Sequence, residues 1–287
     1  MKPAPFQLHI PEGREEALEL LEQYGDDAKV LAGGQSLVPM LALRLARFDH
    51  LVDVNRIDEL AGIWRTNGSL RIGATTRHRA IEQSAEVASA VPLLARATAH
   101  VGHFQIRNRG TLGGAVAHAD PAAEQPAVCV ALDAVMELAT ASGTRSVAAD
   151  QFFEGTWATA VAPDEMLVGI TFPLWEGQCG FAVEEVARRH GDFALVGVTC
   201  GVVAGSGGGV SRAAISLFGV GPTPVRAYRG EAALVAGAGL DDVAAAVSEE
   251  DINPTDDLHA SGAYRRRVAA VLTRRAVARA MEEAGSA

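Results

Sequence analysis

The sequence predicts an α+β protein with a two-lobed unit over residues 1–176 and a smaller unit over residues 177–287. Up to residue 172, short apolar runs alternate with segments of helical periodicity, which is typical of mixed strand and helix lobes. After residue 177, strand-like runs come first and helices follow, which indicates an antiparallel sheet covered by helices. Pro173 and the pair Glu176-Gly177 mark the boundary between the two units.

The first lobe, residues 1–56, is predicted as strand, helix, strand, loop, helix and strand. Strands are expected over 6–10, 29–32 and 50–54, and helices from Pro11 to Gly25 and over 37–45. This is not the fingerprint of a Rossmann fold, which needs G-x-G-x-x-G directly after its first strand.

The second lobe, residues 57–176, carries a similar mixture of elements. Strands are expected over 70–74, 135–140 and 167–172, and helices over 76–84, 92–100 and 121–132. The last of these helices would point its positive N-terminal end toward any bound anion.

The C-terminal unit, residues 177–287, is predicted to start with strands over 181–188, 195–204 and 213–220. A helix is expected to begin at Asp241-Asp242, and the longest helical pattern runs over 265–283 after Ser261. Six arginines between positions 265 and 279 indicate a solvated helix face, with a partner-docking face as the alternative.

Two glycine stretches carry the chemistry. Residues 31–37 read L-A-G-G-Q-S-L, between a predicted strand and a predicted helix, and residues 111–121 read T-L-G-G-A-V-A-H-A-D-P. Adjacent glycines can turn several backbone N–H groups toward one anion. Each stretch alone is explained by a tight turn, but two of them can grip the two phosphates of a dinucleotide from opposite sides.

Composition excludes several functions. The 287 residues carry a net charge of −10, which argues against general nucleic-acid affinity. No run is long and apolar enough for a membrane span, and residues 1–10 lack the apolar core of a signal peptide, so a cytoplasmic protein is expected. The three cysteines form no C-x-x-C pair, and no histidine spacing fits a metal site.

Three stretches together resemble a known family. Residues 32–39 match A-G-G-x-S-L-x-P, residues 111–121 match T-[LI]-G-G-N-x-x-x-A-D-P at all but one place, and residues 188–194 match R-R-x-G-D-[FYW]-A. They resemble the FAD-binding medium subunit of molybdenum hydroxylases, the family of carbon monoxide dehydrogenase and xanthine dehydrogenase. The resemblance implies an FAD domain of the vanillyl-alcohol oxidase (PCMH) type, followed by a flavoprotein-like C-terminal domain.

The resemblance also implies a set of FAD contacts. The backbone N–H groups of both glycine stretches would bind the pyrophosphate, Val101, Leu167 and Phe193 would lie near the flavin, and Asp120 and Glu124 would hydrogen-bond the cofactor. The residues implied are Val30, Leu31, Ala32, Gly33, Gly34, Gln35, Ser36, Leu37, Val101, Thr111, Gly113, Gly114, Ala115, His118, Asp120, Glu124, Leu167 and Phe193. Core packing for the apolar members, and helix capping for Asp120 and Glu124, are the alternatives.

Two positions depart from the family pattern. Ala115 stands where relatives have Asn, so only its backbone can contact FAD. Glu185 stands where many relatives have Lys, and a carboxylate there would disfavour a reduced anionic flavin. The flavin potential and the electron acceptor are therefore left open.

The implied function is that of an electron-transfer subunit without a catalytic residue of its own. Electrons would leave a substrate at the molybdenum cofactor of a large subunit and reach FAD through two [2Fe-2S] clusters of a small subunit. FAD would pass them to an external acceptor, within a dimer of heterotrimers. The alternatives are a stand-alone flavin oxidase of the vanillyl-alcohol oxidase type and a flavin-free assembly protein.

Overall fold

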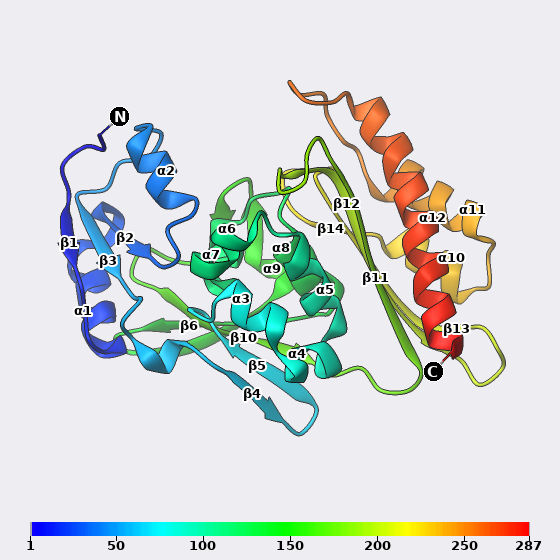
Figure 1. The fold of residues 1–287 in the computed structure, drawn as a ribbon, viewed down its shortest axis with the longest axis horizontal. Coiled ribbons are helices and arrows are strands. Elements are labelled where there is room, and N and C mark those ends of the chain that lie inside the picture. Colours follow the sequence, from blue (N-terminus) through cyan, green and yellow to red (C-terminus); the bar gives the residue numbers. More distant parts are fainter. Residues whose placement is uncertain (1, 287) are drawn as a thin grey trace.

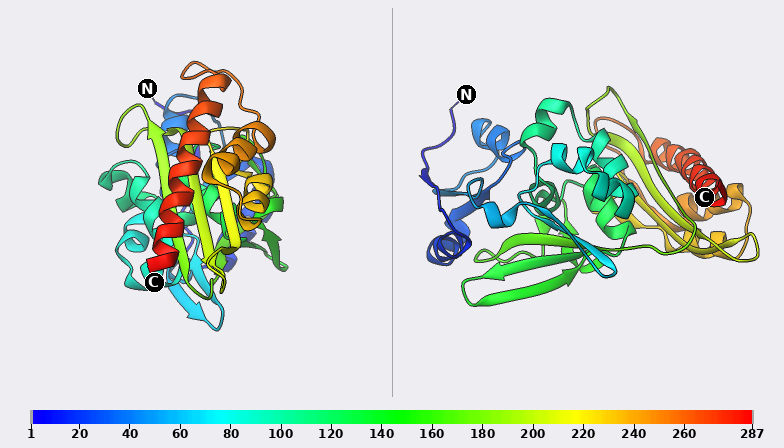
Figure 2. Two further views of the ribbon diagram at one scale, coloured as in Figure 1. Left: turned by 90° about the vertical axis from the view of Figure 1, so that its right-hand side faces the viewer. Right: turned by 60° about the horizontal axis from the view of Figure 1, so that its bottom comes forward.

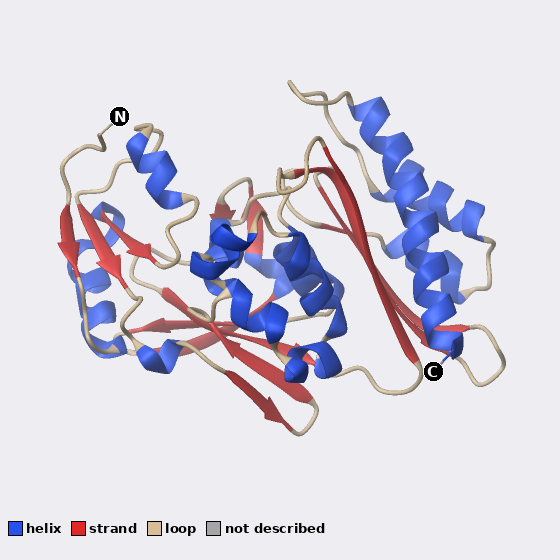
Figure 3. Ribbon diagram, in the orientation of Figure 1, coloured by secondary structure: helices blue, strands red, loops and turns tan. Residues whose placement is uncertain are grey.

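Three sheets follow one another in chain order along the long axis of the protein (Figure 1). The computed structural model describes residues 2–286. A small parallel sheet lies at the N-terminal end, a mixed helix and sheet lobe lies in the middle, and a long antiparallel sheet covered by helices forms the C-terminal end (Figure 3). The α+β class predicted from the sequence is confirmed.

The N-terminal lobe holds a three-stranded parallel sheet in the order β1-β3-β2. Its elements are β1 (Gln7–His9), α1 (Arg14–Tyr24), β2 (Ala28–Leu31), α2 (Leu37–Ala42) and β3 (His50–Asp53). Helix α1 buries Ala17, Leu18 and Leu21, which share a core with the strands and with Val168 of the middle lobe. The first glycine stretch connects β2 to α2 at one end of this sheet.

The middle lobe is built on a five-stranded antiparallel sheet in the order β4-β5-β10-β6-β7. The strands are β4 (Ile63–Thr66), β5 (Ser69–Gly73), β6 (Val135–Thr140), β7 (Gly143–Ala148) and β10 (Met166–Pro173). A short ribbon of β8 (Phe153–Gly155) and β9 (Ala158–Thr159) follows α9 (Ala149–Phe152).

Six further helices form the upper layer of the middle lobe in Figure 1. They are α3 (His78–Gln83), α4 (Ala85–Ala90), α5 (Pro92–His100), α6 (Phe104–Arg109), α7 (Leu112–His118) and α8 (Glu124–Ala131). Leu93, Leu112 and Val128 from this layer pack with Ile72 and Ile170 of the sheet in one buried core.

The C-terminal unit is a four-stranded antiparallel sheet with helices on its outer face (Figure 2, left). The strands are β11 (Cys179–Ala187), β12 (Ala194–Ala204), β13 (Val210–Phe218) and β14 (Val225–Arg226), and the helices are α10 (Tyr228–Val235), α11 (Leu240–Ala246) and α12 (Gly262–Ser286). Ala269, Leu272 and Ala276 of α12 are buried against the sheet. The opposite face lies against α5 and α8.

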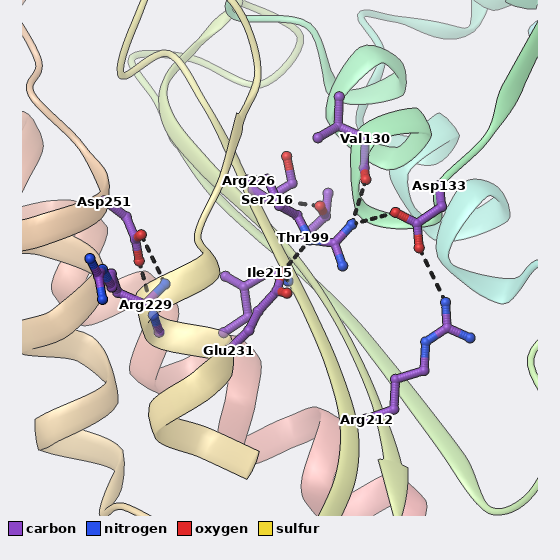
Figure 4. A network of polar contacts seen from close by, with 11 residues as sticks. Val130, Asp133, Thr199, Arg212, Ile215, Ser216, Arg226, Arg229, Glu231 and Asp251 are labelled. Carbon is purple, nitrogen blue, oxygen red and sulfur yellow. Dashed lines mark hydrogen bonds and ion pairs between the residues drawn. The ribbon is translucent and has the colours of Figure 1, made fainter. Parts of the chain in front are cut away.

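Polar contacts tie the C-terminal unit to the end of α8 (Figure 4). The Arg226 guanidinium donates to the Val130 main-chain oxygen at 2.7 Å and to Asp133 Oδ1 at 3.0 Å. Arg226 also pairs with Glu231, whose carboxylate accepts from the Ile215 N–H at 2.8 Å. One buried guanidinium therefore bonds to both units.

The helices and strands of the structure differ from the predicted ones in several places. Strand β4 and helix α4 were not expected. The predicted helix over 121–132 begins at Glu124, because Asp120 Oδ1 accepts from the Ala122 N–H and closes a separate turn before it. Thr76 does not cap α3, since its hydroxyl bonds to Gly62 on a neighbouring loop. The second glycine stretch is the first turn of α7 rather than an open loop.

Candidate functional site

The two glycine stretches lie against each other. A Cβ on Gly33 would meet the main-chain oxygen of Arg109 and come within 2.8 Å of the Gly110 Cα. A Cβ on Gly114 would lie 3.7 Å from the Ala32 Cβ. The fold thus brings residues 32–34, at the end of β2, to the start of α7, as a shared dinucleotide grip requires.

The first stretch holds unused hydrogen-bond donors. Gly34 takes a φ of +72°, which turns the chain sharply before α2. Within residues 2–286, the backbone N–H groups of residues 33–36 donate to no protein acceptor, and the Ser36 hydroxyl has no partner. Gln35 instead bonds back to the Gly33 oxygen through its Nε2 at 3.0 Å. Consecutive unpaired N–H groups at a turn form a concave site that favours an anion.

The backbone N–H groups of the second stretch already donate hydrogen bonds to acceptors within the chain. Gly113 N–H donates to the Ala74 oxygen at 2.8 Å, Gly114 N–H to Thr111 Oγ1 at 3.1 Å, and Ala115 N–H to the Thr111 oxygen at 3.0 Å. In this structure these three N–H groups have acceptors within the chain, while the Thr111 hydroxyl accepts from Gly114 and keeps its own hydrogen to donate. The glycines here serve close packing, since a Cβ on Gly113 would lie 2.5 Å from the Ala74 Cβ.

The C-terminal end of α7 places two more of the predicted cofactor contacts, His118 and Asp120, beside Trp157. His118 stacks on Trp157 with ring centroids 6.2 Å apart, and burial lowers the pKa of the histidine. Asp120 Oδ2 lies 3.5 Å from the Trp157 indole nitrogen, while its Oδ1 closes the turn at Ala122. Asp120 therefore closes the turn before α8 and does not cap the helix, whose N-cap is Ala123.

Glu124 lies at the buried first turn of α8 beside two other titratable groups. Its pKa is raised to about 8, mainly by burial and to a smaller extent by the neighbouring charges of Glu185 and Asp120. His100 Nδ1 lies 3.2 Å from Glu185 Oε1, and this hydrogen bond raises the pKa of His100. The other oxygen of Glu185 is buried without a protein partner. The site therefore holds a cluster able to store a proton near neutral pH.

The three predicted flavin neighbours occupy different environments. Leu167 is buried in β10 and belongs to the core of the middle lobe. Val101 is half-buried after α5, and Phe193, 58% exposed, lies between β11 and β12. That hairpin reaches the start of α6, where the His103 and His190 rings meet edge to face at 5.5 Å.

Comparison with known proteins identifies this arrangement. The family described as FAD binding domain in molybdopterin dehydrogenase matches residues 4–175, and the CO dehydrogenase flavoprotein C-terminal domain matches residues 181–280. The chain belongs to the FAD-binding medium subunits of the molybdenum hydroxylase family. It is an oxidoreductase subunit, and its cofactor is FAD.

Relatives of this medium subunit match over nearly the full chain. It is 38% identical to the alpha subunit of the 6-hydroxypseudooxynicotine dehydrogenase complex of Paenarthrobacter nicotinovorans, covering 99% of this chain and 97% of the relative. It is 39% identical to the carbon monoxide dehydrogenase medium chain of Hydrogenophaga pseudoflava, covering 96% and 97%.

Solved structures of the family have the same fold. A chain of carbon monoxide dehydrogenase from Hydrogenophaga pseudoflava superposes with a TM-score of 0.95 at 39% identity, covering 99% of each chain. A chain of quinoline 2-oxidoreductase from Pseudomonas putida 86 superposes with a TM-score of 0.92 at 35% identity, again covering 99% of each chain.

The first glycine stretch of this medium subunit fits the cofactor. Four unpaired N–H groups and the Ser36 hydroxyl can replace the water around a pyrophosphate, and the packing of Gly33 against residues 109–110 leaves the turn no freedom to collapse. Nowhere in residues 2–286 do three or more His, Cys, Asp or Glu side chains converge as metal ligands would. None of the helices in that range has the length and apolar character needed to cross a membrane.

Sequence reasoning missed four residues beside the glycine stretches. Asn55 and Arg77 hydrogen-bond to their main chain, and Trp157 covers His118. His78 lies buried under Gly110 with neither ring nitrogen bonded, and burial lowers its pKa to about 4. No motif marks these positions, because each becomes significant only when separate segments meet.

Proposed function

We propose that this chain carries electrons through FAD inside a three-subunit molybdenum hydroxylase. A large subunit would hold the molybdenum cofactor and oxidise the substrate, and a small subunit would hold two [2Fe-2S] clusters. This chain would receive the electrons and pass them to an external acceptor, in a dimer of heterotrimers. FAD suits this position because it accepts electrons singly and releases them in pairs.

The observation that carries the proposal is the row of four unpaired N–H groups at residues 33–36 beside the start of α7. We assign pyrophosphate binding to this row and to Ser36. Thr111, Gly113, Gly114 and Ala115 would form the opposite wall by packing. We keep Val30, Leu31, Ala32 and Leu37, with Val101, His118, Asp120, Glu124, Leu167 and Phe193, as proposed cofactor contacts.

The domain division is part of this proposal: an FAD domain over residues 1–176, with lobes 1–56 and 57–176, and a C-terminal domain over 177–287. Cytoplasmic residence is also proposed. It is supported by the three cysteines, none of which is in a disulfide, since oxidising compartments favour paired thiols.

The segment Ile106–Arg109 in α6 is a second candidate docking surface beside the arginine-bearing helix, and it has the better support. Phe104, Ile106 and Phe193 expose 58%, 36% and 58% of their surface. Two of the arginines of α12 bind within the chain instead: Arg265 donates to the Gly219 oxygen at 2.9 Å, and Arg274 pairs with Asp241 at 3.1 Å. We therefore place the iron–sulfur partner near α6.

Flavin binding tests the first part of the proposal. The purified chain should show FAD absorption bands, and acid precipitation should release all the colour, because no covalent link is expected. Gly33→Val and Gly114→Val should abolish binding, since their side chains block the approach of the loops. Wild-type affinity in either variant would refute the assignment of the site.

The electron source tests the second part. Candidate organic substrates should reduce the flavin of the reconstituted complex and leave the isolated subunit nearly unreduced. Bleaching of the isolated subunit at a rate comparable to the complex would favour the stand-alone oxidase. A chain that purifies without flavin and cannot be reconstituted would favour the assembly protein.

A further inference from the structure

A chain of three hydrogen bonds links the two glycine stretches. Asn55 Nδ2 donates to the Ala32 main-chain oxygen at 2.7 Å, and Asn55 Oδ1 accepts from Arg77 Nη2 at 2.6 Å. Arg77 Nη1 donates to the Arg109 main-chain oxygen at 2.5 Å. Two side chains thereby connect the main chain just before Gly33 to the main chain just before Gly110.

Further contacts fix the positions of Asn55 and Arg77 themselves. Asp53 Oδ1 accepts from the Asn55 backbone N–H at 2.9 Å and from its Nδ2 at 2.5 Å, which fixes the amide orientation. Arg77 forms an isolated antiparallel bridge with Thr111. The bridge is closed by the His78 N–H to the Gly110 oxygen at 2.9 Å and by the Leu112 N–H to the Thr76 oxygen at 3.0 Å.

The rest of the contact between the two stretches is van der Waals packing, which is weaker than the three hydrogen bonds. Gly33 approaches residues 109–110 because it has no Cβ, and no hydrogen bond joins residues 33–36 to residues 109–115 within the described part of the chain. A guanidinium bond to a carbonyl is stronger than a neutral bond, since the donor is charged. Within the described residues, the Asn55–Arg77 pair therefore forms the hydrogen-bonded connection between the two walls.

We propose that Asn55 and Arg77 are positioning residues that set the gap between the glycine stretches before FAD enters. A gap formed in advance lowers the ordering cost that binding would otherwise carry. This inference rests on the proposed FAD site, but it concerns the apo-protein, so it is tested separately from cofactor binding.

Variants at these positions should fold. A hollow of about 270 Å³, open to solvent, lies beside Asn55, Thr75, Thr76 and Arg77, so truncation enlarges an existing space and creates no sealed cavity. Arg79→Ala is the control, because Arg79 lies two residues after Arg77 and pairs with Glu82 at 3.1 Å, and none of its contacts among the described residues is to a residue of either stretch.

The first measurement is hydrogen exchange on the full-length apo-protein. Arg77→Ala and Asn55→Ala should speed exchange at least tenfold at the hydrogen-bonded amides of Val38, just after the first stretch, and of Gly110 and Leu112, with an unchanged melting temperature, while Arg79→Ala should not. Asn55→Asp keeps the acceptor for Arg77 but loses the donor to Ala32, so it should affect the Val38 amide more than the amides of Gly110 and Leu112. Unchanged exchange in Arg77→Ala would overturn the proposal even if the wild type bound no FAD.

The second measurement is FAD dissociation from the same variants. Arg77→Ala should raise the Kd for FAD at least tenfold, mostly because FAD associates more slowly with a disordered site. Arg77→Lys should recover part of the lost affinity. Because the two side chains act in series, the double variant should bind no worse than Arg77→Ala alone. Independent, multiplying losses in the double variant, or wild-type affinity in Arg77→Ala, would contradict the proposed role.

Discussion

Arg226 of β14 donates a 2.7 Å hydrogen bond to the main-chain oxygen of Val130, in the last turn of α8. The helix that begins beside the cofactor site therefore ends on the C-terminal sheet. Because the same guanidinium neutralises the buried carboxylate of Glu231, one side chain supports both the C-terminal core and its junction with the FAD domain.

Arg226→Ala should lower the free energy of unfolding by roughly 3–5 kcal/mol, because it leaves the Glu231 carboxylate buried without a cation. Denaturant titration would measure the loss. Arg212→Ala is the control, since Arg212 pairs with the exposed side of Asp133 and should cost about 1 kcal/mol or less. Similar losses in both variants would mean that Arg226 acts as an ordinary surface charge.

Glu124→Gln should change how stability depends on pH. The pKa of Glu124 is raised from 4.5 to about 8 in the folded chain, so the folded state holds a proton that the unfolded state releases. At pH 4.5 the wild type and the variant should have similar free energies of unfolding. As the pH rises through 8 the wild type should become the less stable of the two, by roughly 3–5 kcal/mol at high pH. Thermal melts from pH 4.5 to 9 would test this, with the exposed Glu154→Gln as control.

Glu185→Gln should lower the pKa of His100, because the hydrogen bond that His100 donates to the Glu185 carboxylate is the main cause of its elevation. The stabilisation from this pair is present below the unfolded pKa of histidine and is lost as pH rises through the folded pKa. NMR titration of His100, assigned with a His100→Gln variant, would measure the shift. Glu184→Gln should move it less, since that carboxylate makes the smallest contribution.

Gly33→Ala should weaken FAD binding at least tenfold although it adds one methyl group. The new Cβ would push against the Arg109 oxygen and the Gly110 Cα, which forces the first stretch away from α7. Fluorescence titration with FAD would report the change. Gly143→Ala adds the same group where no atom lies within 4 Å, so it should bind normally. Equal affinity in the two variants would show that the close approach has no role in binding.

The sequence predicted the main elements because local patterns determine them. Strands β10 and β12 are continuous apolar runs, and α5 starts at Pro92, which is already set for a first helical turn. The start of α8 was wrong by three residues, because the side chain of Asp120 closes a turn that competes with the helix. Strand β4 was missed because only one of its four residues is even half-buried, so it has no alternating pattern to read.

The site was predictable only where glycine motifs mark it. Residues 33–36 keep their donors unpaired, but the donors at Gly113 and Gly114 are satisfied by Ala74 and Thr111. That difference depends on β5 lying under α7, which no local pattern reports. Asn55 and Arg77 escaped notice for the same reason, since their partners lie 22 or more positions away in the chain.

The backbone N–H groups of the two glycine stretches differ in whether they are already hydrogen-bonded. This difference bears on when FAD can bind to the subunit. Since α7 meets its hydrogen-bonding needs within the polypeptide, that wall is complete as soon as the chain folds, whereas residues 33–36 must be hydrated until an anion replaces the water. A newly made chain can therefore wait, folded and empty, and acquire its flavin after synthesis.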